Sequence, residues 1–193
     1  MSTGDKNDPF PFTIEEANII IRFPTVERNM RRHPKIDRTY DIPYLAGYSY
    51  DGETIYFDRD LKLWTYLGKE INTDRFLLLH EKVEKALIDA IEKNGDPKDV
   101  QRLLILLHMT KPTDQIYYHT HGVATACELY AVRMQHGASG EKSYNSFMGT
   151  QIKRMESERI TRVPANLDMT AYGGSDRQDV HLRAVMHAAM NAA

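Results

Sequence analysis

The segment from Asp74 to Lys93, DRFLLLHEKVEKALIDAIEK, constrains the fold more than any other part of the chain. Its apolar residues recur at three- and four-residue intervals, which is the spacing of one face of an α-helix. Thr73 or Asp74 can cap the start of this helix, and Gly95 follows its end. The predicted inward face consists of Phe76, Leu77, Val83, Leu87, Ile88 and Ile91. Other elements must therefore pack against this helix.

Two ionisable residues, His80 and Glu84, fall within this apolar face, whereas Lys82, Lys85 and Asp89 are expected to point elsewhere. A buried, charged and unpaired glutamate costs several kcal/mol, so Glu84 needs a compensating partner. Residues four apart lie on one side of a helix about one turn apart. An imidazole nitrogen and a carboxylate oxygen at this spacing can converge on one cation.

The composition limits what such a cation site can contain. The chain has 193 residues, with 25 Lys and Arg, 27 Asp and Glu, eight His and the single cysteine Cys127. The net charge of −2 fits neither a strongly basic nucleic-acid binder nor an acidic disordered chain. One cysteine excludes an intrachain disulfide framework and multi-cysteine zinc or iron–sulfur sites. A metal would have to be held by histidines and carboxylates.

The apolar runs stop at about five residues, far short of a membrane span, and the N-terminus lacks the pattern of a signal peptide. We therefore expect a soluble protein of a reducing compartment. The mean hydropathy of −0.53 agrees with this expectation.

The remaining pattern predicts an α+β fold, in which a small β-hairpin or sheet packs on about three helices. Strands are expected at Tyr44 to Tyr50 and at Thr54 to Phe57, because Asp51-Gly52 between alternating runs is a strong hairpin signal. A second helix is expected from Pro97 to Met109 and a third from Thr113 to Gln135, with Gly137 as its stop. The predicted core stripe of the third helix is Val123, Cys127, Tyr130 and Met134; His121 and Glu128 share a second face with Tyr117, Ala124 and Ala131.

The segments on either side of this core, which spans 43–137, are predicted to be arms. Residues 1–42 contain four prolines, which favour an extended N-terminal arm, although Ile14 to Phe23 could form a short helix. Residues 138–193 form a C-terminal extension with weak periodicity, in which residues 150–160 and 180–193 could be helical. Five cations of the N-terminal arm outnumber its nearby acids and form either a solvated segment or a contact with an acidic partner: Arg28, Arg31, Arg32, Lys35 and Arg38.

The candidate site combines His80 and Glu84 with a ligand from the third helix. His121 and Glu128 are the natural suppliers, and His119 and His108 are weaker candidates. A divalent metal, zinc above all, takes such nitrogen and oxygen ligands at roughly 2.0 to 2.2 Å and leaves a fourth position for water. Glu81, beside His80, is placed to act as the general base on that water.

A metal-free arrangement accounts for the same residues. His80 and Glu84 could satisfy each other, or pair with an arginine such as Arg59 or Arg133, as a buried polar network. Helix spacing alone does not distinguish this network from a metal site.

The residues also carry a resemblance. The stretches PYLAG, DGETIYFDR and LLLHEKVEKAL, with the later His121, Ala124 and Glu128, resemble small uncharacterised proteins of tailed bacteriophages and prophages. The strand TIYFDRDL and the helix with His80-Glu81 are also similar to the edge strand and active-site helix of zincin metallopeptidases, whose motif is HExxH. This resemblance covers about 43–137 and implies a zincin-like core. Glu84 replaces the second motif histidine, and added negative charge makes zinc a weaker Lewis acid.

Two functions follow as expectations. The first is a bacteriophage virion structural or assembly protein with a zincin-like, metal-binding core, whose arms dock on neighbouring virion subunits or on copies of itself. The second is a zinc-dependent hydrolase of the peptidase type, with a peptide substrate and Glu81 as general base. The expected location is the virion, assembled in the host cytoplasm, or otherwise the cytoplasm. No membrane partner is expected, and a nucleic-acid partner rests only on the cations between Arg28 and Arg38.

Overall fold

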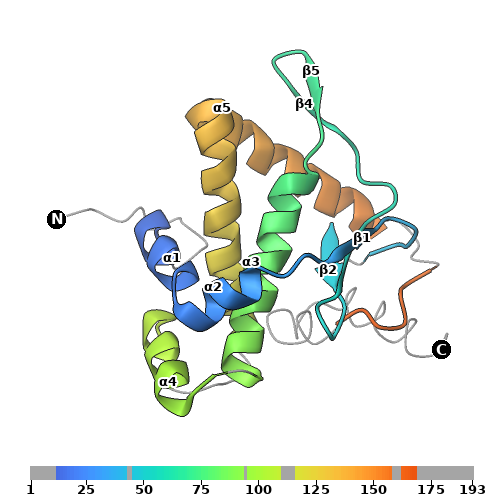
Figure 1. The fold of residues 1–193 in the computed structure, drawn as a ribbon. Helices are drawn as coiled ribbons and strands as arrows, with labels where there is room; N and C mark the ends of the chain where they lie inside the picture. The colour runs from blue at the N-terminus through green and yellow to red at the C-terminus, as the bar shows by residue number, and fades with distance from the viewer. Residues whose placement is uncertain (1–11, 43–44, 94, 110–115, 158–161, 169–193) are drawn as a thin grey trace.

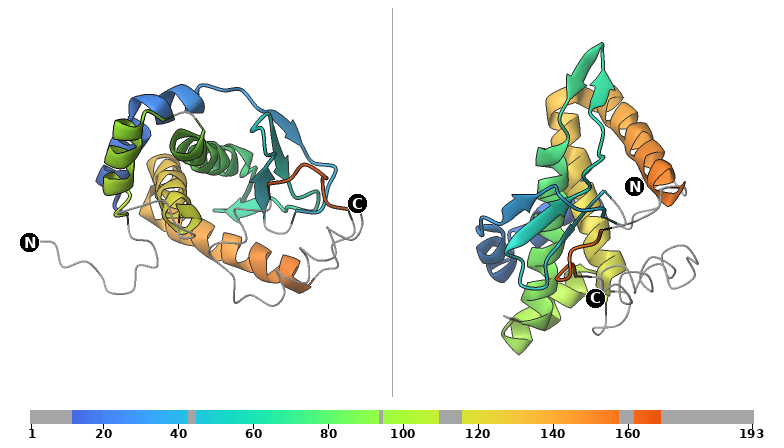
Figure 2. Two further views of the ribbon diagram at one scale, coloured as in Figure 1. Left: turned by 90° about the horizontal axis from the view of Figure 1, so that it is seen from below. Right: turned by 90° about the vertical axis from the view of Figure 1, so that its right-hand side faces the viewer.

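The computed structural model describes residues 12–42, 45–93, 95–109, 116–157 and 162–168. Helix α3 (Asp74–Glu92) and helix α5 (Ile116–Ser157) lie side by side at the centre and form the most extensive contact between any two elements (Figure 1). Helices α1 (Ile14–Ile21) and α4 (Pro97–Leu106) lie on one side of this pair, and a small sheet lies on the other (Figure 2). The predicted α+β class is confirmed.

Helix α3 buries the apolar face that its spacing predicts. Phe76, Leu77, Val83, Leu87, Ile88 and Ile91 are all buried. His80 and Glu84 are buried with them, at 7% and 5% exposure. Lys85 and Asp89 are buried as well, although the sequence analysis places them away from the inward face. The helix is covered on more than one side, because α2 packs against it in addition to α5 and the sheet.

The sheet has the strand order β1–β3–β2. Strand β2 (Ala46–Tyr48) pairs antiparallel with β3 (Thr54–Phe57), and Tyr48 lies opposite Ile55. This pairing confirms the predicted hairpin, and Gly52 in its turn has φ of +73°, a conformation that glycine adopts without strain. Residues 43–44 of the predicted first strand lie outside the described residues. Strand β1 (Lys35–Asp37), which the sequence analysis missed, pairs parallel with β3.

A second hairpin projects from the body of the molecule (Figure 1). It consists of β4 (Trp64–Tyr66) and β5 (Lys69–Ile71), joined by Leu67 and Gly68. Both joining residues have positive φ, as a two-residue type I′ turn requires. The sequence analysis did not predict this hairpin, because a leucine at the first turn position is an atypical signal.

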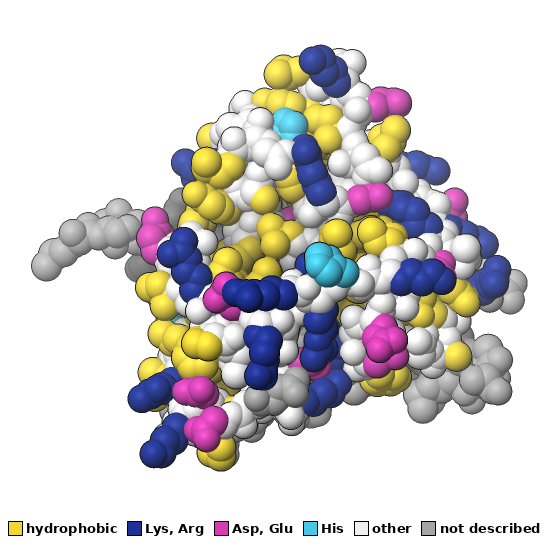
Figure 3. All heavy atoms as spheres, in the orientation of Figure 1, with side chains coloured by type: hydrophobic (Ala, Val, Ile, Leu, Met, Phe, Trp, Pro, Cys, Tyr) yellow, Lys and Arg dark blue, Asp and Glu magenta, His cyan; other side chains and the backbone are white. Residues whose placement is uncertain are grey.

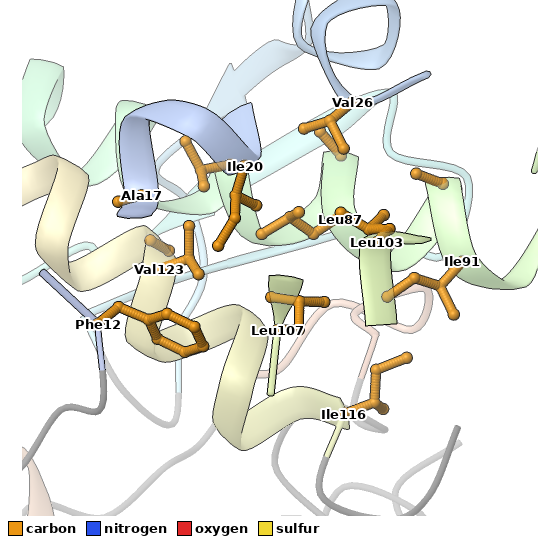
Figure 4. Close-up of a cluster of buried hydrophobic side chains, with 14 of the residues drawn as sticks. Phe12, Ala17, Ile20, Val26, Leu87, Ile91, Leu103, Leu107, Ile116 and Val123 are labelled. Carbon is orange, nitrogen blue, oxygen red and sulfur yellow. The ribbon is translucent and has the colours of Figure 1, made fainter. Parts of the chain in front are cut away.

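The N-terminal segment is not an extended arm over its described part. Helix α1 and helix α2 (Pro24–Met30) bury Ala17, Ile20 and Val26 in a core with α3, α4 and α5 (Figure 4). Thr13 and Glu16 form a capping box at the start of α1. Pro24 stands in the first turn of α2, where its missing N–H breaks no helical hydrogen bond. The prolines therefore separate helices here rather than prevent them.

Helix α5 changes direction at Gly137, which has φ of +70° and ψ of 179°. The predicted stop at Gly137 is thus correct, but a second helical stretch follows at once. Its residues Tyr144 and Met148 are buried in a core with the sheet, Trp64 and Phe76, so residues 138–157 belong to the folded body. The C-terminal extension was predicted as an arm because weak periodicity does not reveal a helix that packs at a sharp turn.

The predicted core stripe of the third helix is half correct. Val123 and Cys127 are buried, but Tyr130 and Met134 are 36% and 68% exposed. The face that contacts α3 carries Ala124 and Glu128 instead, together with the fully buried Val132. Glu128 of α5 pairs with His80 of α3, and this contact turns the more polar face of α5 inward instead of the more apolar face. The predicted start of this helix at Thr113 lies outside the described residues.

Residues 162–168 run along the free edge of β2 (Figure 1). The amide of Asp168 donates to the Tyr48 carbonyl at 2.8 Å, and the amide of Tyr50 donates to the Asn166 carbonyl at 3.1 Å. Leu167 is buried in a small cluster with Ile42 and Tyr56. This segment holds β2 in place. The helix predicted at 180–193 and the first eleven residues lie outside the described part. No helix in the described residues is both long and apolar enough to cross a membrane.

Candidate metal centre

Three ligand-type atoms converge where α3 faces α5. Nε2 of His80 lies 3.1 Å from Nδ1 of His121 and 3.4 Å from Oε2 of Glu84. Nδ1 of His121 lies 3.1 Å from the same Glu84 oxygen. Among the described residues, these three form the one group of histidine, cysteine and carboxylate side chains that could hold a metal ion. His80 and Glu84 come from one turn of α3, and His121 comes from the first turns of α5.

These separations match the spacing of ligands around a small cation. Tetrahedral ligands of zinc at roughly 2.0–2.1 Å lie about 3.3 Å from one another. The three observed separations of 3.1, 3.1 and 3.4 Å form a triangle of that size. The residues present therefore fit a divalent ion. The same separations also suit hydrogen bonds among the three side chains, so this spacing is shared by a divalent-metal site and a metal-free network.

The three ligand-type residues leave a fourth coordination position, which lies on the side of the site that is open to solvent. The side chains of His80 and Glu84 are 9% and 7% exposed, whereas the side chain of His121 is 51% exposed. The site is thus buried at its base and open at His121. An open fourth position is typical of catalytic zinc sites, whereas structural sites are closed by four protein ligands.

Glu128 lies behind His80 rather than within the triangle. Its Oε2 is 2.7 Å from Nδ1 of His80, on the opposite side of the imidazole from Nε2. Glu128, which the sequence offers beside His121 as a source of the third ligand, is outside the group of possible ligand atoms, and its carboxylate engages the far nitrogen of His80 instead. A carboxylate in this position accepts the Nδ1 proton of a metal-ligating histidine and leaves Nε2 free to bind. Glu128 thereby fixes the orientation and tautomer that a ligand His80 needs.

Two tyrosines complete the site, and the sequence analysis missed both. The Tyr48 hydroxyl donates to Oε1 of Glu84 at 3.1 Å, and the Tyr144 hydroxyl donates to Oε1 of Glu128 at 2.5 Å. Tyr48 lies on β2, inside a strand that the sequence predicts, so its inward direction was a usable signal. Tyr144 lies beyond the Gly137 turn, and no pattern in the sequence connects it with Glu128.

The surroundings set the ionisation of the cluster. Burial alone lowers the pKa of His80, but its hydrogen bonds to Glu128 and Glu84 outweigh this effect and raise the pKa well above its usual value. Burial raises the pKa of Glu84, but hydrogen bonds from His121 and His80 lower it to about 2. The pKa of Glu128 is lowered in the same way by His80 and Tyr144, against the effect of burial. Both carboxylates are therefore ionised at neutral pH.

Glu81, the predicted general base, is buried at 7% exposure. It makes no hydrogen bond or ion pair with any described residue, and it lines a cavity of about 20 Å³ with Tyr48, Lys85 and Arg32. Burial raises its pKa to about 8, and the carboxylates of Glu84 and Glu128 add to this rise while His80 opposes it. Its role as a base stays a prediction.

The structure also separates the alternatives that the sequence left open. His121, and not His119, joins the triangle, because residues two apart point about 200° from one another on a helix. The ring of His119 instead makes a T-shaped contact with Phe12, and its buried Nδ1 has no hydrogen-bond partner among the described residues. His108 lies 3.5 Å from Glu16, on the far side of the molecule from β2.

The arginines proposed as metal-free partners also lie elsewhere. Arg59 pairs with Asp41 at 2.7 Å, and Arg133 lies 3.8 Å from Glu141. Within the described residues, no lysine or arginine forms an ion pair with Glu84 or Glu128.

A second buried charged cluster lies on another side of the same helix. Asp89 is 1% exposed and accepts from Arg32 at 2.8 Å, Lys85 at 3.0 Å and Lys93 at 3.2 Å. Lys85 also donates to the Tyr50 carbonyl at 3.0 Å, and burial lowers the pKa of Lys85 in spite of its acidic neighbour. We call these four side chains the Asp89 cluster. The buried Asp89 carboxylate is thus compensated by protein cations alone, and the buried Asp168 lies a further 3.9 Å from Lys85.

The cations of the N-terminal segment lie on the face shown in Figure 3, where Lys and Arg side chains gather over α2 and β1. Three of the five are already paired within the chain. Arg31 binds Glu27 at 2.8 Å, Arg32 binds Asp89, and Arg38 pairs with Asp74. These ion pairs offset part of the local excess of positive charge.

Comparison of the chain with family models, with curated proteins and with solved structures found no match.

Proposed function

We propose that the protein binds one zinc ion through His80, Glu84 and His121 and acts as a metal-dependent hydrolase. The observation that carries the proposal is the triangle of Nε2, Oε2 and Nδ1 atoms at 3.1 to 3.4 Å. Two histidines with one glutamate are a ligand set that catalytic zinc sites use. The half-exposed side chain of His121 supports a site with room for water and substrate.

The charge of the site supports a divalent ion. Two buried carboxylates, Glu84 and Glu128, face two imidazoles and no lysine or arginine among the described residues. When both imidazoles are neutral, a charge of +2 balances the two carboxylates. Buried charges that lack such balance are costly. A divalent cation therefore satisfies both the geometry and the electrostatics of this cluster.

Each residue of the centre has a separate role in the proposed hydrolysis. Glu128 orients His80 from behind, and Tyr48 holds one oxygen of Glu84 so that the other points to the centre. A zinc ion held by the three ligand residues would supply Lewis-acid chemistry: it would lower the pKa of a bound water and polarise a substrate carbonyl. The resemblance to zincins implies that Glu81 would accept the proton from that water. The substrate class that follows is a peptide or related amide.

Metal analysis tests the binding part of the proposal. Purified protein is expected to carry, or to take up, about one equivalent of zinc per chain by elemental analysis and titration calorimetry. His80→Ala and His121→Ala are expected to lose this equivalent. The matched control is His119→Ala, two residues from His121 on the same helix, which should retain it. A wild-type protein that binds no divalent metal would contradict the proposal.

The catalytic part has its own test. Cleavage of a peptide library by zinc-loaded protein is expected to disappear in Glu81→Gln, while the zinc content of that variant stays unchanged. Cleavage that persists in Glu81→Gln would remove Glu81 from the mechanism. If zinc-loaded wild type cleaves no peptide, the site is a zinc site without peptidase activity.

The virion role is a second proposal, and it also stays a prediction. It draws on the resemblance to tailed-phage proteins and on two arms that are expected to dock on neighbouring subunits. Residues 12–42 pack on the chain's own core instead, through Ala17, Ile20 and Val26, so this part of the argument no longer supports it. Detection of the chain at a fixed copy number in purified particles would support the role, and its absence there would contradict it.

A further inference from the structure

We infer that Tyr144 is a positioning residue for the metal centre, and that the helical stretch after Gly137 sets the affinity of the site through it. The inference rests on the proposed zinc site. It concerns a residue outside the group of three possible ligands. The hydrogen bond that Tyr144 makes to the centre goes to Glu128.

A continuous chain of contacts runs from this residue to the centre. The Tyr144 hydroxyl donates to Oε1 of Glu128, and the other oxygen of Glu128 accepts from Nδ1 of His80. Nε2 of His80 then faces Glu84 and His121. Each oxygen of Glu128 thus has one partner. The hydroxyl fixes the rotation of the carboxylate, and the carboxylate fixes the rotation of the imidazole.

Tyr144 is itself held firmly. It is 1% exposed, and its ring meets the rings of Trp64 and Phe76 edge-on at centroid distances of 5.3 and 5.5 Å. The neighbouring Ser143 accepts from Nε1 of Trp64 at 3.2 Å. Burial and the adjacent carboxylate raise the pKa of Tyr144 far above its usual value, so the phenol keeps its proton. It is therefore a permanent donor to Glu128.

The turn at Gly137 makes this contact feasible. Glu128 and Tyr144 are sixteen residues apart, and a straight helix would separate them by about 24 Å. The bend at Gly137 folds the second stretch of α5 back towards the first (Figure 1). Gly137 has φ of +70°, where other residues are strained. The bend at Gly137 is therefore required to bring the Tyr144 hydroxyl to Glu128.

The structure supplies a matched pair of variants. Tyr144→Phe removes only the hydroxyl and keeps the ring between Trp64 and Phe76. Tyr66→Phe makes the same change in the same aromatic cluster, where the ring of Tyr66 stacks on Trp64 at 5.1 Å. The Tyr66 hydroxyl contacts Ser139 at 2.7 Å and has no contact with the metal centre. A general loss of packing or of a tyrosine hydrogen bond would affect both variants.

The experiment is zinc titration of wild type, Tyr144→Phe and Tyr66→Phe, with Co²⁺ absorption as a second readout of ligand geometry. Loss of a partner of this kind weakens metal binding by about 10- to 100-fold. We expect a rise of about 10-fold in the zinc Kd of Tyr144→Phe, with an altered Co²⁺ spectrum, and no change for Tyr66→Phe. Thermal unfolding of the metal-free forms checks that both variants fold.

The possible failures are distinct. Equal zinc Kd values for wild type and Tyr144→Phe would overturn the role of Tyr144 and leave the zinc site intact. Equal weakening by Tyr144→Phe and Tyr66→Phe would assign the effect to packing and also overturn it. Absence of zinc binding in wild type would overturn the proposed function and the inference together. If Tyr144→Phe does not fold, Glu128→Gln tests the same chain, and a wild-type Kd in that variant would overturn the inference.

Discussion

Helix α3 buries two charged clusters on different sides, and they balance their charges in different ways. In the Asp89 cluster, one carboxylate meets Arg32, Lys85 and Lys93 within 3.2 Å. In the metal centre, the two carboxylates form ion pairs only with imidazoles among the described residues, and each also accepts from a neutral tyrosine hydroxyl. The first cluster is complete as a protein structure. The second has an excess of negative charge that a proton on His80 or an external cation must offset.

This difference shows how a structural ion pair can be distinguished from a binding site when both are buried on the same helix. Both clusters are buried, and both shift the pKa values of their members. Burial and pKa shifts alone therefore do not mark a site. What distinguishes the centre is the convergence of three ligand-type atoms within 4.8 Å of one another and an opening to solvent at His121.

The largest expected effect on stability comes from breaking the Asp89 cluster. Asp89→Asn leaves the buried Lys85 with only Asp168, at 3.9 Å, and loss of one member of a buried pair costs about 3–5 kcal/mol. The matched change Glu84→Gln, measured in EDTA, is expected to cost only about 1 kcal/mol, because it removes surplus negative charge and keeps an amide oxygen that can still accept a hydrogen bond. Urea unfolding of both variants measures the difference. Equal costs would show that the two clusters balance their charge in the same way.

Zinc is expected to stabilise only through the metal centre. At a free zinc concentration 100 times its Kd, the free energy of unfolding rises by about 2.7 kcal/mol, because the ion binds the folded state. The rise is expected to disappear in Glu84→Gln and to persist in Lys85→Met. Thermal unfolding with zinc and with EDTA measures it. Stabilisation of the Glu84→Gln variant by zinc would place the ion elsewhere.

Removal of Lys85 is expected to cost less than removal of Asp89. In Lys85→Met, the Asp89 carboxylate keeps Arg32 and Lys93, and the methionine retains the apolar part of the side chain beside Tyr48. The lost hydrogen bonds are expected to cost about 1–2 kcal/mol in urea unfolding. A cost as large as that of Asp89→Asn would mean that Lys85, and not the carboxylate, organises the cluster.

The smallest expected effect is that of Lys93. Its side chain is 48% exposed, so its ion pair with Asp89 is screened by water. Lys93→Met is expected to cost less than about 1 kcal/mol and to lose that cost in high salt. Urea unfolding at low and high ionic strength measures both points. A salt-independent loss above this size would show that Lys93 acts as a buried member of the cluster.

Local patterns in the sequence predicted the parts of the fold that depend on spacing alone. The inward face of α3, the hairpin around Asp51-Gly52 and the break at Gly137 all follow from short-range rules, and the structure has each of them. The placement of His80 and Glu84 on one face of α3 is also a short-range prediction. It follows from helical periodicity, whatever the helix packs against.

Long-range parts of the site could not be predicted in this way. The sequence offered His119, His121 and Glu128 as ligands, and the choice depends on how α5 is rotated against α3. The outward assignment of Lys85 and Asp89 failed because α2 and the turn after β2 cover that side of the helix. Tyr144 reaches Glu128 only through the bend in α5.

The sequence by itself determined the local elements and the need for a partner to Glu84, because helix periodicity and the cost of a buried charge act within one segment. Tertiary structure decided that the partner set is His80 and His121, with Glu128 behind His80, because helix rotation and the angle at Gly137 bring together residues that no short spacing connects.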